Sequence, residues 1–161
     1  MTGASDISVR PARVEDAEAV AILAVELRAH LGDPTHFMTP DVIRRDGFGS
    51  RPEFQLQIAA VDGVLAGYAL FFDAYEPAYA ARGFYLADLC VGAAHRRRGI
   101  GRLLVDAVSE AARARGRTFV LWQAAPENIG ALQFYKSLNL DLIKPLVVHV
   151  RILDGTQIDP S

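Results

Sequence analysis

An arginine-rich loop with two glycines, set between an apolar run and a helical run, constrains this chain most. Residues 85–91 are apolar enough for a buried strand, residues 103–115 have helical spacing, and the sequence between them includes His-Arg-Arg-Arg-Gly-Ile-Gly-Arg at 95–102. A strand that turns into a helix through such a loop leaves the first N–H groups of the helix without partners, and these groups bind anions. Gly99 and Gly101 lack a Cβ, so a phosphate can approach the main chain closely. The surrounding positive charges come from Arg96, Arg97, Arg98 and Arg102.

The loop differs from two common phosphate-binding motifs. It has no Gly-Lys-Ser/Thr sequence for Mg²⁺ and a nucleoside triphosphate, and no third glycine with a following acidic residue for a dinucleotide. A diphosphate bound without a metal is the hypothesis that remains. The alternative is an exposed basic turn that merely precedes a helix.

Composition limits the class of protein. A chain of 161 residues with 51% hydrophobic residues suits one globular domain, which we expect over residues 1–161. The formal net charge of −2 argues against nucleic acid or an anionic membrane as partners, and the apolar stretches are too short to span a bilayer. The four histidines are scattered without ligand spacing, so no metal site is expected. One cysteine and an N-terminus without a signal pattern predict a cytoplasmic protein.

Hydrophobic spacing and turn signals predict an α+β fold with a mixed central sheet. Strands are expected over residues 7–10, 54–61, 64–73, 84–91, 118–124 and 142–153. Helices are expected from about residue 15 to Gly32, from Pro40 to about 47, from Gly101 to 115, and over 128–138. The dipeptide Asp62-Gly63 joins two strands in a hairpin, and residues 76–83 form a breaker-rich connection. The N-terminal strands would form an antiparallel meander, and residues 84–124 a βαβ crossover that carries the arginine loop.

A second segment follows the strand expected at 118–124. Asn128, Ala131 and Tyr135 are three and four residues apart, so they share one face of the predicted helix and can line one groove. This segment resembles the Asn-x-x-Ala-x-x-Phe-Tyr pattern of the GNAT superfamily of N-acetyltransferases. The loop sequence Arg96-x-x-Gly99-x-Gly101 resembles the superfamily's Gln/Arg-x-x-Gly-x-Gly/Ala loop, which holds the pyrophosphate of acetyl-coenzyme A. The two motifs also occur in the family's order.

The resemblance implies a single GNAT-like domain that uses acetyl-CoA as cosubstrate and acetylates a primary amine of a small molecule. Tyr135 would be the general acid that protonates the departing sulfur, whereas the alternative is a packing tyrosine. The strand before the loop would bind the pantetheine arm and supply an oxyanion N–H, whereas its default interpretation is ordinary core. The coenzyme-binding residues implied are Leu89, Cys90, Val91, Arg96, Arg97, Arg98, Gly99, Ile100, Gly101, Arg102, Asn128 and Ala131.

Further segments resemble the spermidine/spermine and thialysine acetyltransferases, which are homodimers acting on small amines. These segments are Arg10-Pro11-Ala12, residues 39–49, residues 85–89 and residues 134–138. Two departures matter: Ala87 stands where the pattern has Glu, and Leu31 replaces an acidic residue near the end of the first helix.

Carboxylates are needed to offset the lost hydration of a polycation, so these two departures predict weak polyamine binding. Asp73, Glu76 and Asp88 remain as possible amine-facing acids. The alternative function is a catalytically weak coenzyme A-binding sensor or scaffold.

Overall fold

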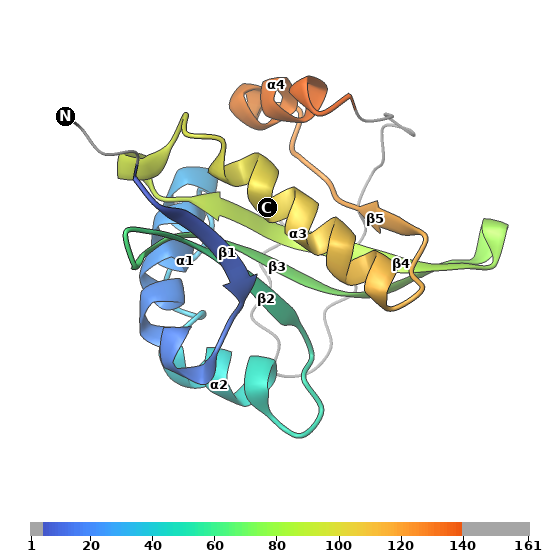
Figure 1. Cartoon of the computed structure of the whole chain (residues 1–161), viewed down its shortest axis with the longest axis horizontal. Helices are drawn as coiled ribbons and strands as arrows, with labels where there is room; N and C mark the ends of the chain where they lie inside the picture. Colours follow the sequence, from blue (N-terminus) through green and yellow to red (C-terminus); the bar gives the residue numbers. More distant parts are fainter. Residues whose placement is uncertain (1–4, 140–161) are drawn as a thin grey trace. The chain divides into compact units, whose positions relative to one another are not determined.

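The computed structural model describes residues 5–139, and the chain divides into two compact units, Met1–Gln123 and Ala124–Ser161 (Figure 1). The first unit holds a five-stranded sheet with the order β1-β2-β3-β4-β5. The second unit holds helix α4 among its described residues. The strand predicted over 142–153 lies outside the described residues.

The sheet is mixed, as predicted. Strands β1 (Ile7–Pro11), β2 (Gln55–Val61), β3 (Val64–Glu76) and β4 (Ala81–Val91) pair antiparallel, and β5 (Phe119–Leu121) pairs parallel to β4. Asp62 and Gly63 both have positive φ, 50° and 82°, as the tight turn between β2 and β3 requires. The antiparallel meander, the parallel crossover and the α+β class are therefore confirmed.

The helices begin and end at the predicted signals. A 3₁₀ turn (Val14–Asp16) leads into α1 (Ala17–Leu31), which ends at Gly32 in the left-handed conformation, φ 77°. Helix α2 (Pro40–Phe48) begins after Thr39, whose hydroxyl accepts the Val42 N–H at 3.3 Å. Helix α3 (Ile100–Ala114) begins at the end of the first motif, and α4 (Ile129–Ser137) carries most of the second.

Two predicted boundaries are wrong. Half of the connection expected over residues 76–83 is strand, because β3 and β4 pair as far as Glu76 with Ala81 around a 3₁₀ turn, Pro77–Tyr79. The Glu76 carboxylate accepts the Ala78 N–H at 3.0 Å, so the breaker residues form a tight turn instead of a loop. The strand expected over 118–124 is only Phe119–Leu121, because β5 has partners on β4 at Gly83–Tyr85 alone.

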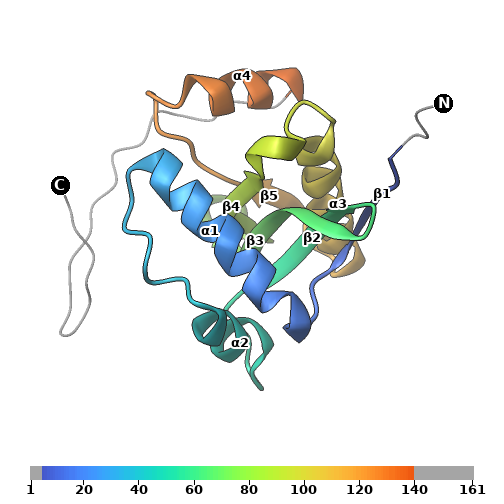
Figure 2. The ribbon, with the colours of Figure 1, turned by 90° about the vertical axis from the view of Figure 1, so that its left-hand side faces the viewer.

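The helices of the first unit cover both faces of the sheet. Helix α1 lies in front of the sheet and α3 behind it in Figure 2, and both contact β3. The core on the α1 and α2 face includes Val20, Leu23, Ile43, Ile58, Tyr68 and Leu70. On the other face a Cβ on Gly67 would lie 3.3 Å from Leu104, so α3 packs closely against β3. This packing sets the start of α3 just after β4 ends, which is where the arginine loop lies.

Candidate functional site

The loop presents the N-terminus of α3 without a cap. Arg97 and Gly99 have positive φ, 63° and 78°, and Gly99 is the N-cap residue. A Cβ on Gly99 would find nothing within 4 Å, so the backbone conformation favours glycine here and the space above it is open. The N–H groups of Ile100 and Gly101 have no acceptor within the helix, because they belong to its first turn. This arrangement suits an anion.

The arginines of the loop differ in the contacts that their side chains make. Arg96 turns back onto the fold: its Nε donates to the Val91 carbonyl at 3.2 Å, and its Nη2 lies 3.4 Å from the Glu26 carboxylate. Arg97 and Arg98 are exposed, and Arg98 Nη1 lies 3.5 Å from His95 Nδ1. Arg102 is exposed in the first turn of α3.

Glu26 is a loop-positioning residue that the sequence did not reveal. Its Oε1 accepts the Ala93 N–H at 2.8 Å in addition to its contact with Arg96. The carboxylate on α1 therefore holds the start of the loop. Only its place on the helix could have hinted at this, since its two partners are 67 and 70 residues away in the chain.

The end of β4 has a free edge on the side of β5. The β4–β5 ladder covers only Gly83–Tyr85, so no described strand pairs with Leu89–Val91 on that side. Main-chain groups alternate between the two edges of a strand. The Gly92 N–H donates to the Ala66 carbonyl at 2.9 Å, on the β3 side, which places the N–H groups of Leu89 and Val91 at the open edge.

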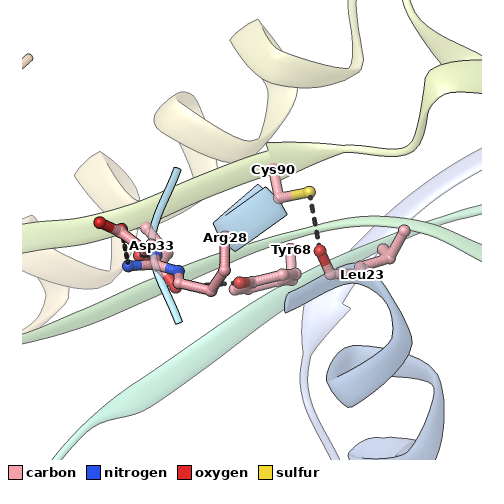
Figure 3. A network of polar contacts seen from close by, with 6 residues as sticks. Leu23, Arg28, Asp33, Tyr68 and Cys90 are labelled. Carbon is pink, nitrogen blue, oxygen red and sulfur yellow. Dashed lines mark hydrogen bonds and ion pairs between the residues drawn. The ribbon is translucent and has the colours of Figure 1, made fainter. Parts of the chain in front are cut away.

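Cys90 differs from its two neighbours. Its main-chain groups face β3, and its buried thiol donates to the Leu23 carbonyl at 3.5 Å, a contact drawn in Figure 3. Burial raises the pKa of the Cys90 thiol to about 12, so the thiol is neutral. Among the three strand residues expected to bind the coenzyme, Leu89 and Val91 thus present groups to the open edge, while Cys90 packs against α1.

Helix α4 carries the second motif. Asn128 is its N-cap, and its side-chain oxygen accepts the Ala131 N–H at 3.1 Å. This cap joins two of the motif residues in the first turn of α4. Tyr135 lies further along the helix and is half-buried. Burial raises the pKa of Tyr135, so its phenol is protonated at neutral pH.

The three acids considered for the amine all have partners in the structure. Asp73 pairs with Arg117 at 2.9 Å, and Glu76 caps the 3₁₀ turn. Asp88 is buried: its Oδ1 pairs with Arg28, and its Oδ2 accepts the Tyr68 hydroxyl at 2.9 Å. Each of the three carboxylates therefore already has a partner within the protein.

The two departures from the polyamine pattern lie at the surface. Ala87 is the extra residue of a β-bulge, where the register changes from Leu70 with Asp88 to Phe71 with Leu86, and it is exposed. Leu31 is the last residue of α1 and is 42% exposed. Neither position carries a carboxylate that could replace the missing acids.

An open pocket of about 490 Å³ lies beside Asp88 in the first unit. It is lined by Arg28, Met38, Glu53, Phe54, Leu70, Phe72 and Asp88. These residues come from the end of α1, the segments before α2 and β2, and strands β3 and β4. The sequence singled out only Asp88 among them, because a pocket of this kind is assembled from distant segments.

The described residues contain neither a candidate membrane span nor a candidate metal cluster. Over residues 5–139 no helix is long and apolar enough to cross a membrane. In the same part of the chain, no group of three or more His, Cys, Asp or Glu side chains could hold a metal ion.

Known proteins resemble this chain in sequence. The acetyltransferase (GNAT) family profile matches residues 21–139. The chain is 36% identical over 83 residues to an L-ornithine N5-acetyltransferase of Arabidopsis thaliana, covering 52% of this chain and 36% of that protein. It is 26% identical over 142 residues to a thialysine N-epsilon-acetyltransferase of Bos taurus, covering 82% of each chain. The match to the Arabidopsis protein thus spans about a third of that protein's length.

Solved structures share the fold. An aminoglycoside N-acetyltransferase in complex with CoA aligns with a TM-score of 0.79 at 18% identity, covering 94% of this chain and 98% of that one. A ribosomal-protein-alanine N-acetyltransferase from Brucella melitensis aligns with a TM-score of 0.74 at 20% identity, covering 91% and 99%. These likenesses show the fold, and the profile match shows the family. The chain therefore belongs to the GNAT family of acetyltransferases, as its two motifs predicted.

Proposed function

We propose that this protein is an acetyl-CoA-dependent N-acetyltransferase that acetylates a primary amine of a small molecule. One observation carries the proposal: the uncapped N-terminus of α3 and the free edge of β4 at Leu89 and Val91 adjoin each other in one unit. A diphosphate joined to an amide-containing arm needs such a pair of features. The names of the relatives, ornithine and thialysine N-acetyltransferases, support an amine as acceptor.

The residues present fit the coenzyme. The N–H groups of Ile100 and Gly101 would hold the pyrophosphate, with Arg97, Arg98 and Arg102 supplying charge. The open edge at Leu89 and Val91 would pair with the amides of the pantetheine arm. The resemblance to the family supports Asn128 and Ala131 as further coenzyme-binding residues. When bound, acetyl-CoA supplies the activated acetyl group.

The chain's own residues would then manage charge and protons. The amine nitrogen would form a bond to the acetyl carbon while the π electron pair of the carbonyl group moves to its oxygen. When the C=O bond re-forms, the carbon–sulfur bond would break and its electron pair would go to sulfur. An N–H at the open edge of β4 would stabilise the oxygen that becomes negative. Tyr135 would donate its proton to the departing sulfur, and water would accept the proton lost by the amine. The raised pKa of Tyr135 suits this role, because the proton is present at neutral pH.

Replacing Tyr135 tests the acid role. In Tyr135→Phe we expect kcat for thiol release from acetyl-CoA, measured across a panel of amines, to fall about 10²- to 10⁴-fold. Coenzyme affinity measured by calorimetry should stay unchanged, because the phenyl ring remains. Tyr79→Phe, at a side chain that is 83% exposed on the 3₁₀ turn, is the matched control. Full turnover by Tyr135→Phe would assign the tyrosine to packing alone.

A coenzyme A-binding sensor or scaffold is the second candidate function. The exposed Ala87 favours it, because the related enzymes have a glutamate in this place to help deprotonate a cationic amine. Calorimetry and thiol release separate the two functions: a sensor binds acetyl-CoA but releases no thiol with any amine.

We also propose that the protein works as a cytoplasmic homodimer. The resemblance to the diamine acetyltransferases supports the dimer, and the single buried cysteine is compatible with a reducing compartment. Fractionation of cells that produce the native chain would test the location.

A further inference from the structure

The pocket beside Asp88 has an unusual distribution of charge. One of its lining residues is the buried Asp88, and both carboxylate oxygens have partners within the protein. Oδ1 forms an ion pair with Arg28, and Oδ2 accepts the Tyr68 hydroxyl at 2.9 Å. Arg28 reaches Asp88 from the last turn of α1 and also contacts Asp33 at 3.2 Å (Figure 3). A buried carboxylate in an acceptor pocket would otherwise be the natural partner of a substrate ammonium. Here the protein supplies the cation itself.

The rest of the pocket is mostly apolar. Its other walls are Met38, Phe54, Leu70 and Phe72, and Phe72 is 38% exposed although it is a large hydrophobic side chain. Within the part of the chain that the structure describes, the carboxylate of Glu53 has no ion pair or hydrogen bond. The pocket therefore offers hydrocarbon contact and one uncompensated carboxylate near the surface.

The pocket also lies next to the proposed reaction centre. Asp88 immediately precedes Leu89, whose N–H is at the open edge of β4 where the thioester would bind. A ligand in the pocket would thus extend from the thioester toward the apolar walls and the Arg28–Asp88 pair.

We propose that this pocket binds the acceptor and that Arg28 determines its class: Arg28 occupies the place of a second substrate cation, so the acceptor is a primary monoamine with an apolar body. This inference rests on the proposed function and narrows it. A diamine would have to bring its second ammonium beside a guanidinium that already occupies Asp88. The unpaired carboxylate that lines the pocket, Glu53, is exposed at the surface, where water and salt screen its attraction for a cation. A hydrocarbon chain carries no second charge and buries apolar surface instead.

Two amines of equal length test the wild-type protein directly. Cadaverine and n-hexylamine differ only in that a methyl group replaces one ammonium. We expect kcat/KM for thiol release to favour hexylamine by about tenfold or more, because one uncompensated charge is worth at least that factor. Equal turnover of the two amines, or a preference for cadaverine, would overturn the inference while leaving the acetyltransferase function intact. No thiol release with any amine of a broad panel would instead contradict the proposed function, and the inference with it.

Removing the guanidinium should abolish the preference for hexylamine. In Arg28→Met the side chain keeps much of its length, and Asp88 loses its cation, so cadaverine can supply one. We expect the cadaverine-to-hexylamine ratio of kcat/KM to rise about tenfold or more over wild type. Arg28→Lys keeps a cation and should retain the wild-type ratio. Arg44→Met, on α2 and outside the pocket, should leave the ratio unchanged and is the matched control.

A binding measurement covers the case in which Arg28→Met is too unstable for kinetics. Cadaverine should raise the melting temperature of Arg28→Met, because its ammonium compensates Asp88, and should not raise that of wild type. The double variant Arg28→Met with Asp88→Asn should lose this response, since no buried charge is left. A melting temperature of Arg28→Met that cadaverine does not move, together with an unchanged amine ratio, would show that Arg28 only anchors α1 to β4.

Discussion

Asp16 links three segments through one carboxylate. Its two oxygens accept from the Arg10 guanidinium at 2.8 and 2.9 Å, and one of them also accepts the Arg13 N–H at 2.7 Å. These contacts join β1 to the 3₁₀ turn that leads into α1. Burial disfavours the charged carboxylate, but the hydrogen bonds from Arg10 and Arg13 outweigh it, so the pKa of Asp16 is lowered.

Folding therefore favours the ionised form of Asp16. Its contribution to stability is complete above the ordinary value of 3.8 and is lost as pH falls through the lower folded pKa. We expect Asp16→Asn to reduce the free energy of unfolding by roughly 1–2 kcal/mol at neutral pH. The difference from wild type should shrink toward zero in strong acid.

Urea denaturation at neutral pH and well below pH 3.8 measures both quantities. Asp41→Asn, at a carboxylate that is 96% exposed on α2, is the control and should change stability little at either pH. If the difference in free energy of unfolding between Asp16→Asn and wild type stays constant with pH, the shape of the side chain and not its charge matters at this position.

At the scale of elements, the loop before α3 makes a prediction because the chain contains a matched pair of glycines. Gly99 and Gly116 both have positive φ, 78° and 64°, and at both a Cβ would find open space. Gly99→Val and Gly116→Val should each lose roughly 1–3 kcal/mol of stability through backbone strain. Only Gly99→Val should also weaken coenzyme A binding, by about tenfold or more, because its side chain would stand where the phosphates approach.

Thermal unfolding gives the shared loss of stability, and isothermal titration with coenzyme A gives the difference between the two variants. If Gly99→Val binds coenzyme A as tightly as Gly116→Val does, the phosphates lie elsewhere.

Local signals account for the elements that the sequence predicted well. Three such signals each act within about four residues, so they can be recognised from adjacent residues in the sequence. They are the start of α2 at Thr39-Pro40, the end of α1 at Gly32 and the turn at Asp62-Gly63. The length of the β3–β4 hairpin and the bulge at Ala87 could not be read in this way, because a register between strands depends on packing against the rest of the sheet.

At the scale of the whole molecule, the outer face of α1 suggests association. Ile22 is 70% exposed and Val25 is 45% exposed, although both are hydrophobic. The resemblance to homodimeric enzymes predicts a species of twice the chain mass of 17.5 kDa. Sedimentation equilibrium over a range of concentrations measures this mass, and Ile22→Glu would shift the equilibrium to monomer if α1 lies in the interface.

The control for Ile22→Glu is a substitution at a polar position of the same helix. Glu18 is exposed one turn before Ile22 on the same face of α1 and pairs with Arg44, so Glu18→Gln changes a charge on this face without removing apolar surface and should leave the mass unchanged. A mass of 17.5 kDa for wild type at every concentration would contradict the dimer.

The sequence by itself determined the family, the order of the elements and the loop that suits a phosphate, because each depends on residues close together in the chain. Only the tertiary structure decided which charges are available at the site. Arg28 pairs with Asp88 across 60 residues, and Glu26 holds Arg96 across 70. Such pairs form when folding brings distant segments together, and burial then determines whether a charge faces a ligand or is neutralised within the protein.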